Sequence, residues 1–221
     1  MTDAQLALEE KRDQLIEAML PHVPFDGWTR AALYMGAEDI NLSRKEADRI
    51  LPGGPVDLIL QFYHLNTVKM NQELAMLDLP SMKIRERIAT AVKTRILLNK
   101  DQKDAVRKAM SVMAMPQNAI HSTKAMFSAV DAMWYAAGDN ATDWNYYSKR
   151  GLLSGVYSST LLYWLDDKSE NHQATWEFLD RRIGDVMKIP QLKAKATGIL
   201  NKLSELPKLR RSAINRMKVK A

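Results

Sequence analysis

The sequence contains no cysteine, which excludes a disulfide framework, a thiol nucleophile and a thiolate metal site. Glycine is scarce, and the extended Val/Ile/Thr alternation that marks strands is missing. No stretch reaches the roughly 18 uninterrupted apolar residues that a membrane-spanning helix needs. The first residues are acidic and polar, unlike a secretory signal or a transit peptide. We therefore expect a cytoplasmic protein of bacterial type that is peripheral on the inner face of the cell membrane.

The chain also lacks the residue patterns of common enzyme sites. Its four histidines occur singly, and the paired ExxH motifs that build a di-iron bundle are absent. There is no Gly-rich phosphate loop and no GxSxG elbow. Each lone histidine is expected at the surface or at a helix cap, although this pattern does not exclude catalysis. We expect no catalytic residue, no metal and no cofactor.

Most segments between prolines repeat apolar residues at intervals of three and four, which predicts an all-α protein of about nine or ten helices. A second helix is expected from Trp28 to Asp39, and Ser43 with Glu46 predicts a capping box at the start of a third. A longer helix follows from Val56 to about Leu77. Three short helices before a longer one predict an N-terminal helix-turn-helix of the kind that opens TetR-type regulators. The segment from Asp143 to Asp166 is expected to be the most buried helix.

Charge is distributed unevenly along the chain. Residues 188–221 contain ten Lys or Arg and one acid, whereas the rest holds 22 basic and 25 acidic side chains. Residues 1–60 carry six Lys or Arg against eleven Asp or Glu. Because neutralisation of phosphates supplies much of the affinity for DNA, an acidic amino-terminal module opposes operator binding. We expect the helix-turn-helix to be a scaffold and no nucleic acid to bind, with operator binding as the alternative.

Aromatic residues concentrate around one predicted turn in the second half of the chain. They are Trp134, Trp144, Tyr146 and Tyr147. Asp143 can cap the helix that begins there, which accounts for the aspartate but not for the aromatics. Half-buried aromatic side chains beside a helix start are good interface anchors.

Several motifs around this turn carry a closer resemblance. They are Asp131-Ala-Met-Trp134, Gly138-Asp-x-x-Thr-Asp-x-Asn-x-Tyr147, Arg150, Tyr157-x-x-Thr160 and Thr175-Trp-x-Phe-Leu-x-x-Arg182. In order and spacing they resemble the ubiquinone (coenzyme Q) biosynthesis accessory family, the product of the ninth yeast coenzyme Q gene. The similarity reaches back to Gly27-Trp-Thr and covers roughly residues 15 to 188.

This resemblance implies a TetR-like fold, a hydrophobic pocket for isoprenoid or other lipids, and a homodimer. Members of the family deliver lipid-embedded precursors to the membrane-associated di-iron hydroxylase of ubiquinone synthesis. The patch that faces the hydroxylase maps onto Met133, Trp134, Asp143, Tyr146, Tyr147 and Arg150. Tyr146 stands where relatives commonly have tryptophan.

Thirteen methionines are present, and core filling is their ordinary use. Their flexible, polarizable side chains also suit a cavity that holds an isoprenoid tail. We expect such a lipid-binding cavity to be lined by Met110, Met113, Met126, Val156 and Leu161.

The basic end of the chain predicts an amphipathic helix after Pro190. Its apolar residues fall within an arc of about 120°, flanked by lysines whose stems can lie along that arc. A helix of about 24 Å at roughly 1.5 Å per residue is too short to cross a bilayer. We expect it to lie on a membrane surface; the alternative is a helix that packs on the body or on another subunit. The expected membrane-binding residues are Leu192, Lys193, Lys195, Ile199, Lys202, Leu203 and Leu206.

These patterns divide the chain into a helix-turn-helix-like module at 1–60, a helical lipid-binding and dimerisation body at 61–188, and a basic membrane-binding helix and tail at 189–221. The resulting hypothesis is a non-catalytic accessory protein of ubiquinone biosynthesis that presents a quinone precursor to the di-iron demethoxyubiquinone hydroxylase. One alternative is a TetR-type transcriptional regulator that senses a lipid. Another is an unrecognised enzyme of lipid metabolism.

Overall fold

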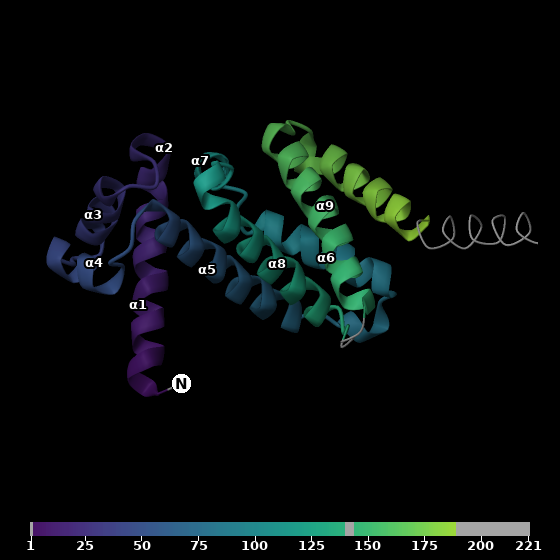
Figure 1. The fold of residues 1–221 in the computed structure, drawn as a ribbon, viewed down its shortest axis with the longest axis horizontal. Coiled ribbons are helices and arrows are strands. Elements are labelled where there is room, and N and C mark those ends of the chain that lie inside the picture. The colour runs from purple at the N-terminus through teal and green to yellow at the C-terminus, as the bar shows by residue number, and fades with distance from the viewer. Residues whose placement is uncertain (1, 140–143, 189–221) are drawn as a thin grey trace, which may run out of the picture. The chain divides into compact units, whose positions relative to one another are not determined.

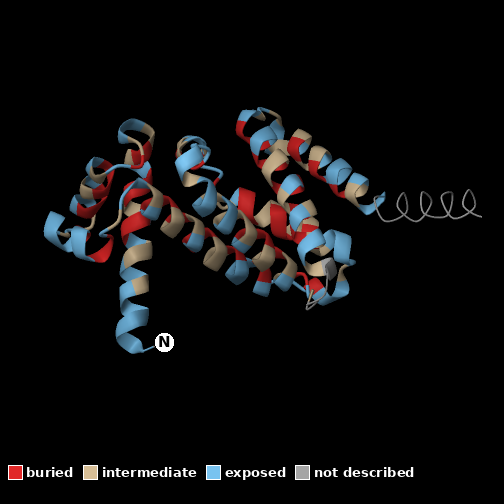
Figure 2. Ribbon diagram, in the orientation of Figure 1, coloured by how far each residue is buried: buried red, intermediate tan, exposed pale blue. Residues whose placement is uncertain are grey.

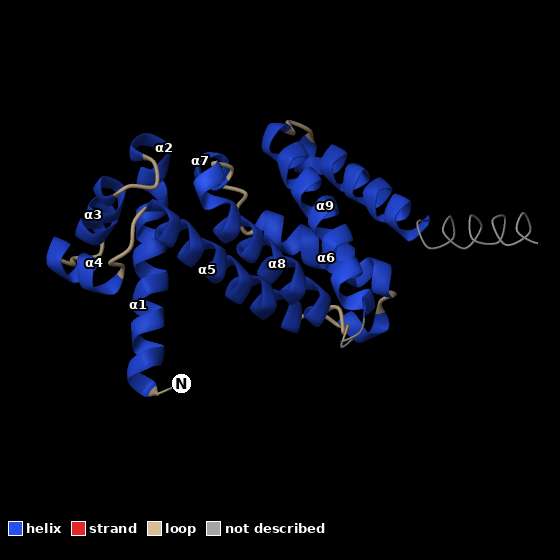
Figure 3. Cartoon of the chain, in the orientation of Figure 1, coloured by secondary structure: helices blue, strands red, loops and turns tan. Residues whose placement is uncertain are grey.

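The computed structural model describes residues 2–139 and 144–188, except for the side chains of residues 144 and 145. Every regular element within those ranges is helical, as Figure 3 shows, so the all-α prediction is confirmed. The helices are α1 (Asp3–Met19), α2 (Val23–Asp26), α3 (Arg30–Asp39), α4 (Arg44–Ile50), α5 (Pro55–Ala75), α6 (Ile84–Leu97), α7 (Lys103–Met113), α8 (Ala119–Ala136) and α9 (Trp144–Asp166). A further helix occupies residues 173–188.

Helices α3 and α4 form the predicted helix-turn-helix (Figure 1). The Ser43 hydroxyl accepts a hydrogen bond from the backbone N–H of Glu46, and the Glu46 carboxylate accepts one from the backbone N–H of Ser43 at 2.9 Å. The predicted capping box is therefore present. Between the two helices, Asn41 adopts a φ of 59°, which is a conformation that asparagine tolerates better than most residues.

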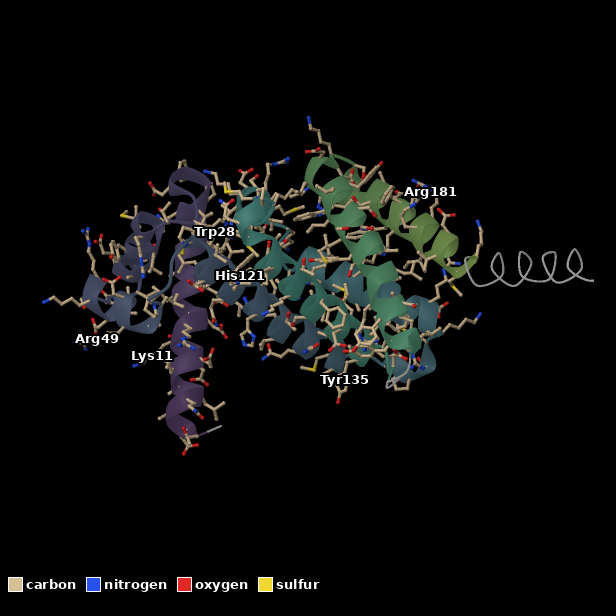
Figure 4. The ribbon with its side chains drawn as sticks, in the orientation of Figure 1. Lys11, Trp28, Arg49, His121, Tyr135 and Arg181 are labelled. Carbon is tan, nitrogen blue, oxygen red and sulfur yellow. The ribbon has the colours of Figure 1, made fainter. Side chains whose placement is uncertain are left out.

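Trp28 connects these short helices to the rest of the chain through a hydrogen bond and a ring contact (Figure 4). Its indole N–H donates to the carbonyl oxygen of Ala105 at 3.0 Å, and its ring centroid lies 5.1 Å from that of Phe62 on α5. The sequence placed Trp28 inside the second helix. The structure begins α3 at Arg30 instead, because Thr29 caps it.

Helices α1 and α3 pack closely against each other. At Gly36 a Cβ atom would lie 2.6 Å from the backbone nitrogen of Met19, so no larger residue fits without movement. Leu15, Ile16 and Leu33 are fully buried at this contact, whereas the first turns of α1 are exposed (Figure 2). The close approach makes α1, α3 and α4 a firmly packed group.

The contacts divide the chain into two units, residues 1–179 and residues 180–221, and only 180–188 of the second are described. The boundary expected at residue 60 falls inside α5, which continues from the helix-turn-helix into the body. In the second unit, Asp185 forms ion pairs with Arg182 at 2.8 Å and with Lys188 at 3.5 Å. The predicted amphipathic helix and tail at 189–221 lie outside the described residues.

The main core lies among α5, α6, α8 and α9, which pack against one another (Figure 2). Its fully or almost fully buried side chains include Met70, Leu74, Val92, Ile96, Val130, Met133 and Trp164. They recur at intervals of three and four along each helix, as one-sided burial requires. In the two described ranges, no helix has both the length and the hydrophobicity to cross a membrane.

Helix α9, which was expected to be the most buried helix, also has an exposed face. Tyr147, Gly151, Gly155 and Leu162 are exposed and follow one another at intervals of four and seven along a single face. The opposite face carries buried residues such as Trp164. We call the exposed set of four residues the α9 stripe.

Candidate functional site

A pocket of about 200 Å³ lies among α5, α6, α7, α8 and α9. Met110 and Met113 of α7, Met126 of α8 and Leu161 of α9 line it. Four of the five residues predicted to line a lipid cavity thus come together in one place. Val156 does not: it is buried but lies outside the lining, because adjacent positions on a helix point about 100° apart and Tyr157 takes the inward position.

Five polar side chains also line this pocket, and they are Tyr63, Arg95, Ser122, Tyr157 and Ser158. Arg95 is only 3% exposed. Its Nε donates to the Tyr157 hydroxyl at 3.2 Å, its Nη1 to the Thr67 hydroxyl at 2.8 Å and its Nη2 to the Tyr63 carbonyl oxygen at 3.2 Å. The pocket therefore combines an apolar wall with a buried cationic group.

Burial raises the pKa of the Tyr63 phenol far above its usual range, and the neighbouring Tyr157 adds to the effect. These two causes outweigh the Arg95 cation, which lowers the pKa of Tyr63, so Tyr63 is a neutral side chain in the physiological range. The cation of Arg95 therefore has no phenolate counter-charge from Tyr63.

The second predicted site lies where α8 ends. Gly138 adopts a φ of 88°, its N–H bonds to the carbonyl oxygen of Tyr135 at 2.9 Å, and the N–H of Asp139 bonds to that of Trp134 at 3.0 Å. These are the two hydrogen bonds of a Schellman motif, in which glycine takes the left-handed position without strain. The motif turns the chain so that the Asp139 carboxylate reaches α9.

Arg150 is the centre of the polar network at this site. Its side chain is 3% exposed, and its Nε donates to Asp131 Oδ1 at 2.6 Å while its Nη1 lies 3.4 Å from Asp139 Oδ2. Lys149 also pairs with Asp139, at 2.8 Å. The guanidinium lies over the Tyr146 ring, 3.3 Å from its centroid. The ion pairs hold α8 and α9 in one arrangement here, and the stacking within α9 orients Arg150 for them.

A cluster of three aromatic rings adjoins the network. Tyr146 and Tyr147 meet edge to face at 5.1 Å between centroids, and Phe127 lies 6.0 Å from the first and 6.4 Å from the second. The hydrogen bond from the Tyr146 hydroxyl to Asp131, at 2.9 Å, raises the pKa of Tyr146, with burial as the second cause. We call Phe127, Tyr146 and Tyr147 the aromatic patch.

The predicted hydroxylase-facing residues differ widely in exposure. Tyr147 is 65% exposed and Tyr146 is half-buried, whereas Met133 and Arg150 are buried. Trp134 is half-buried, and its indole N–H is buried without a protein partner in the described part of the chain. Asp143 lies outside the described residues. Among the described members of this set, Tyr147 is therefore the most accessible, while Met133 and Arg150 lie beneath the surface.

Sequence reasoning missed several residues of both sites. It did not select Arg95, although the arginine is in phase with buried Ile88 and Val92 on α6. Asp139 stands in one of the family motifs but was not chosen as a site residue, and neither was Tyr135, which is 73% exposed at the end of α8 (Figure 4). The partners of Arg95 and Asp139 lie on other helices, so only the fold brings them together.

The helix-turn-helix carries charges that oppose contact with phosphates. On α4, Arg44 is paired with Glu38 at 3.1 Å, and Asp48 is exposed. The hydrogen bonds that Glu46 accepts from Ser43 lower the pKa of this carboxyl, so it is ionised at neutral pH. Two carboxylates therefore accompany the basic residues of the seven-residue candidate recognition helix.

The membrane-binding residues predicted between Leu192 and Leu206 lie outside the described residues. Within 2–139 and 144–188, no group of three His, Asp or Glu side chains is placed to hold a metal ion.

Comparison with known families identifies relatives of this chain. Residues 119–190 match the COQ9 family, and this range contains α8, α9 and the helix at 173–188. The chain is 33% identical to the mitochondrial ubiquinone biosynthesis protein COQ9 of Rattus norvegicus over 199 residues, covering 86% of this chain and 64% of the rat protein. The corresponding human protein is 32% identical over 86% of this chain and 62% of its own length. A probable coq9 protein of Dictyostelium discoideum is 31% identical over 83% and 62%.

The chain thus spans somewhat less than two thirds of the length of these curated relatives. All three are mitochondrial by name, which contradicts the expected cytoplasmic, bacterial-type location. That expectation depended on the composition of the first residues. Because the chain corresponds to only part of each relative, these residues do not decide how the protein is targeted.

Among solved structures, the fold is similar to a TetR transcriptional regulator from Nitrosomonas europaea ATCC 19718. The TM-score is 0.66 at 18% identity, over 80% of this chain and 98% of the regulator. This likeness confirms the predicted TetR-like fold and, at such low identity, concerns the fold alone. The resemblance predicted from the sequence is confirmed as well: this chain is a relative of the ubiquinone biosynthesis proteins COQ9, with the sequence of the COQ9 family in residues 119–190.

Proposed function

We propose that this chain is a non-catalytic, lipid-binding accessory protein of ubiquinone biosynthesis. It holds a quinone precursor in the pocket among α5 to α9 and presents it to the di-iron demethoxyubiquinone hydroxylase, which contacts the aromatic patch. The pocket is the observation that carries the proposal, since residues from α7, α8 and α9 give it an apolar wall. The pathway comes from the names of the relatives, which are ubiquinone biosynthesis proteins.

The chemistry of the pocket supports an isoprenoid ligand. Its volume of about 200 Å³ is below the roughly 300–1,000 Å³ of pockets that enclose drug-sized molecules. A long tail therefore requires side chains that move, or a path to the surface. Met110, Met113 and Met126 provide such adaptability, because a thioether side chain has three rotatable bonds and no branch.

The direct test of lipid binding is mass spectrometry of the purified chain under native conditions, followed by extraction. We expect a co-purified lipid with an isoprenoid tail. A protein that is folded and free of lipid, and that binds none when isoprenoid quinones are added, would contradict the proposal. Turnover of a lipid by the chain alone, without a partner or added metal, would instead support an enzyme.

The aromatic patch supports docking of a partner. Tyr147 is exposed but stands on a rigid base, because Tyr146 and Arg150 beneath it are fixed by Asp131. Such partly exposed aromatics on a fixed support are typical interface anchors. Tyr147→Ala is expected to abolish capture of the hydroxylase in a pull-down, whereas Phe25→Ala, at an exposed aromatic on α2, leaves capture unchanged. Equal capture of the hydroxylase by both variants would contradict docking at the aromatic patch.

The residues beyond the described range support membrane binding by their sequence pattern alone. The apolar spacing predicts a surface helix whose lysines reach anionic headgroups. Ile199→Glu and Leu203→Glu interrupt the predicted apolar arc, and each is expected to prevent flotation with vesicles of phosphatidylcholine and phosphatidylglycerol. Thr197→Glu and Asn201→Glu add the same charge on the side of the predicted helix away from the apolar arc, where helical spacing places these two polar residues, and they serve as controls. Flotation of all four variants would contradict membrane binding by this segment.

The part of the α9 stripe beyond Tyr147, which comprises Gly151, Gly155 and Leu162, supports a homodimer. At Gly151 and Gly155 an added Cβ atom would meet nothing within 4 Å, and a glycine inside a helix costs about 1 kcal/mol relative to alanine. A second copy that packs closely against α9 accounts for both glycines and for the exposed Leu162. In sedimentation velocity, Leu162→Arg is expected to produce monomers, while Ile120→Arg on α8 remains dimeric. A monomeric wild type would exclude the dimer.

The TetR-like fold also supports a second candidate, a transcriptional regulator that senses a lipid. The paired Arg44 and the ionised Glu46 of α4 weigh against it. Salt-sensitive binding to a palindrome near its own gene would favour the regulator. We expect no such binding at physiological salt, since the first 60 residues are acidic.

A further inference from the structure

We propose that the pocket selects an amphiphile whose polar end is an anionic oxygen group, a carboxylate or a phosphate, and that Arg95 binds this group. The inference rests on the lipid-binding part of the proposed function and adds a ligand class to it, because the head group of a demethoxyubiquinone is neutral and gives Arg95 no counter-charge. It depends on the burial of Arg95, on the neutrality of its partners and on its position in the pocket lining.

Arg95 is a buried cation without a carboxylate partner. It is 3% exposed, and in the described part of the chain all of its hydrogen-bond partners are neutral oxygens: two hydroxyls and one carbonyl. A guanidinium stays protonated in proteins and has five N–H donors, of which these bonds use three. Neutral acceptors orient the group without cancelling its charge. Removing such a charge from water is costly unless an anion compensates it.

Arg150 is a buried arginine with a structural role, and it can be compared with Arg95. It is buried to the same degree, yet Asp131 and Asp139 both pair with it, at 2.6 and 3.4 Å. Arg95 has no such pair, and unlike Arg150 it lines the pocket. An anionic group bound in the pocket would give Arg95 the partner that the chain itself does not provide.

The remaining lining matches the rest of an amphiphile. Tyr63 and Tyr157 flank the arginine as neutral hydroxyl-bearing side chains, whereas α7 and α8 contribute Met110, Met113 and Met126. A carboxylate or phosphate accepts parallel N–H bonds from a guanidinium, and such charge-assisted bonds are stronger than neutral ones. The methionines then contact the apolar chain. One pocket thus offers contacts for both the head group and the tail.

The test compares ligands with the same tail and different heads. Decanoate, decyl phosphate and decanol compete with the neutral fluorescent probe N-phenylnaphthylamine for the full-length wild type. A pocket without a cation would favour decanol, because a carboxylate loses more hydration on burial. We expect both anionic ligands to bind about tenfold or more tightly than decanol, as charge-assisted hydrogen bonds predict.

Arg95→Gln is expected to reverse this preference while decanol still binds, and Arg95→Lys to retain part of it. Arg87→Gln is the matched control, because Arg87 also donates to three neutral carbonyl oxygens but lies outside the pocket lining. If Arg95→Gln fails to fold, the inference is tested by the ratio of decanoate to decanol affinity in the wild type and by the same ratio in Arg95→Lys. A wild type that binds decanol as tightly as decanoate would overturn the inference and leave lipid binding intact.

Acetate and inorganic phosphate distinguish an amphiphile from a free anion. We expect neither to displace the probe at concentrations where decanoate and decyl phosphate do. Displacement by acetate as effective as by decanoate would overturn the inference, since the tail would then contribute nothing. If neither the probe nor any decyl ligand binds the wild type, the proposed lipid-binding function fails, and this inference with it.

Discussion

Replacing Arg150 with methionine removes the charge that holds α8 and α9 together at the aromatic patch. Methionine keeps much of the length and apolar contact of the arginine stem, so the change is mainly electrostatic. Asp139, only 10% exposed, then loses one of its cationic partners, and Asp131 loses the donor at 2.6 Å. The expected result is a marked loss of stability.

The size of the stability loss depends on how far water or another cation can replace Arg150 at each carboxylate. Breaking a buried ion pair by removing one partner costs about 3–5 kcal/mol. Asp131 is 41% exposed and regains water, and Lys149 still pairs with Asp139 at 2.8 Å. We therefore expect the lower end of this range, about 3 kcal/mol, which for a chain of this size lowers the Tm by about 6–12 °C.

Urea unfolding followed by circular dichroism measures this loss. Arg182→Met is the control, because its pair with Asp185 is exposed and such pairs contribute at most about 1 kcal/mol. Adding Asp139→Asn to Arg150→Met should restore part of the stability, since the amide needs no counter-charge. A loss below about 1 kcal/mol for Arg150→Met would refute the argument that the network is a buried ionic support.

Three further changes test other parts of the structure. Gly138→Ala forces alanine to a φ of 88° and should destabilise the chain by about 1 kcal/mol in the same urea assay, and no measurable loss would contradict the helix end described here. Met126→Trp fills the pocket and should abolish N-phenylnaphthylamine binding with an unchanged CD spectrum, whereas exposed Met115→Trp should not. Burial alone would raise the pKa of Asp167, but hydrogen bonds, foremost from Thr175, outweigh it and hold this pKa well below its usual range. The stability that this depressed pKa contributes is present above pH 4. It is lost as the pH falls through the unfolded-state pKa of 3.8 towards the lower folded-state pKa. Asp167→Asn should therefore flatten the decline in unfolding free energy below pH 4.

Features that depend on neighbouring residues could be predicted from the sequence. The capping box at Ser43 and Glu46 needs only residues three apart, and the structure contains it as expected. The helical class follows from apolar spacing in the same way. The start of α3 was misplaced by two residues: Trp28 lies before the Thr29 cap, and its indole N–H donates to the carbonyl oxygen of Ala105, 77 residues away.

The spacing of apolar residues did not predict all of the residues that line the pocket. Val156 and Tyr157 are adjacent on α9, a helix with apolar residues on nearly every side, so its sequence does not reveal which face turns to the cavity. Hydrophobicity favoured the valine, while packing against α5 and α6 turned the tyrosine inward, where its hydroxyl accepts from Arg95. A single position, about 100° around the helix, separates the prediction from the structure.

The two buried arginines differ in how readily the sequence reveals them. Arg150 is one of the motifs that carry the family resemblance, and its partner Asp131, 19 positions away, begins another of them. Arg95 stands in an ordinary amphipathic helix, and its partner Tyr157 is 62 positions away. In the sequence, both arginines are charged residues near apolar ones. Only the fold shows that carboxylates pair with Arg150 and that Arg95 has neutral partners. A buried charge that the protein leaves without a counter-charge is costly to keep, and its place in the wall of a pocket is therefore the strongest reason to look for its counter-charge in a ligand.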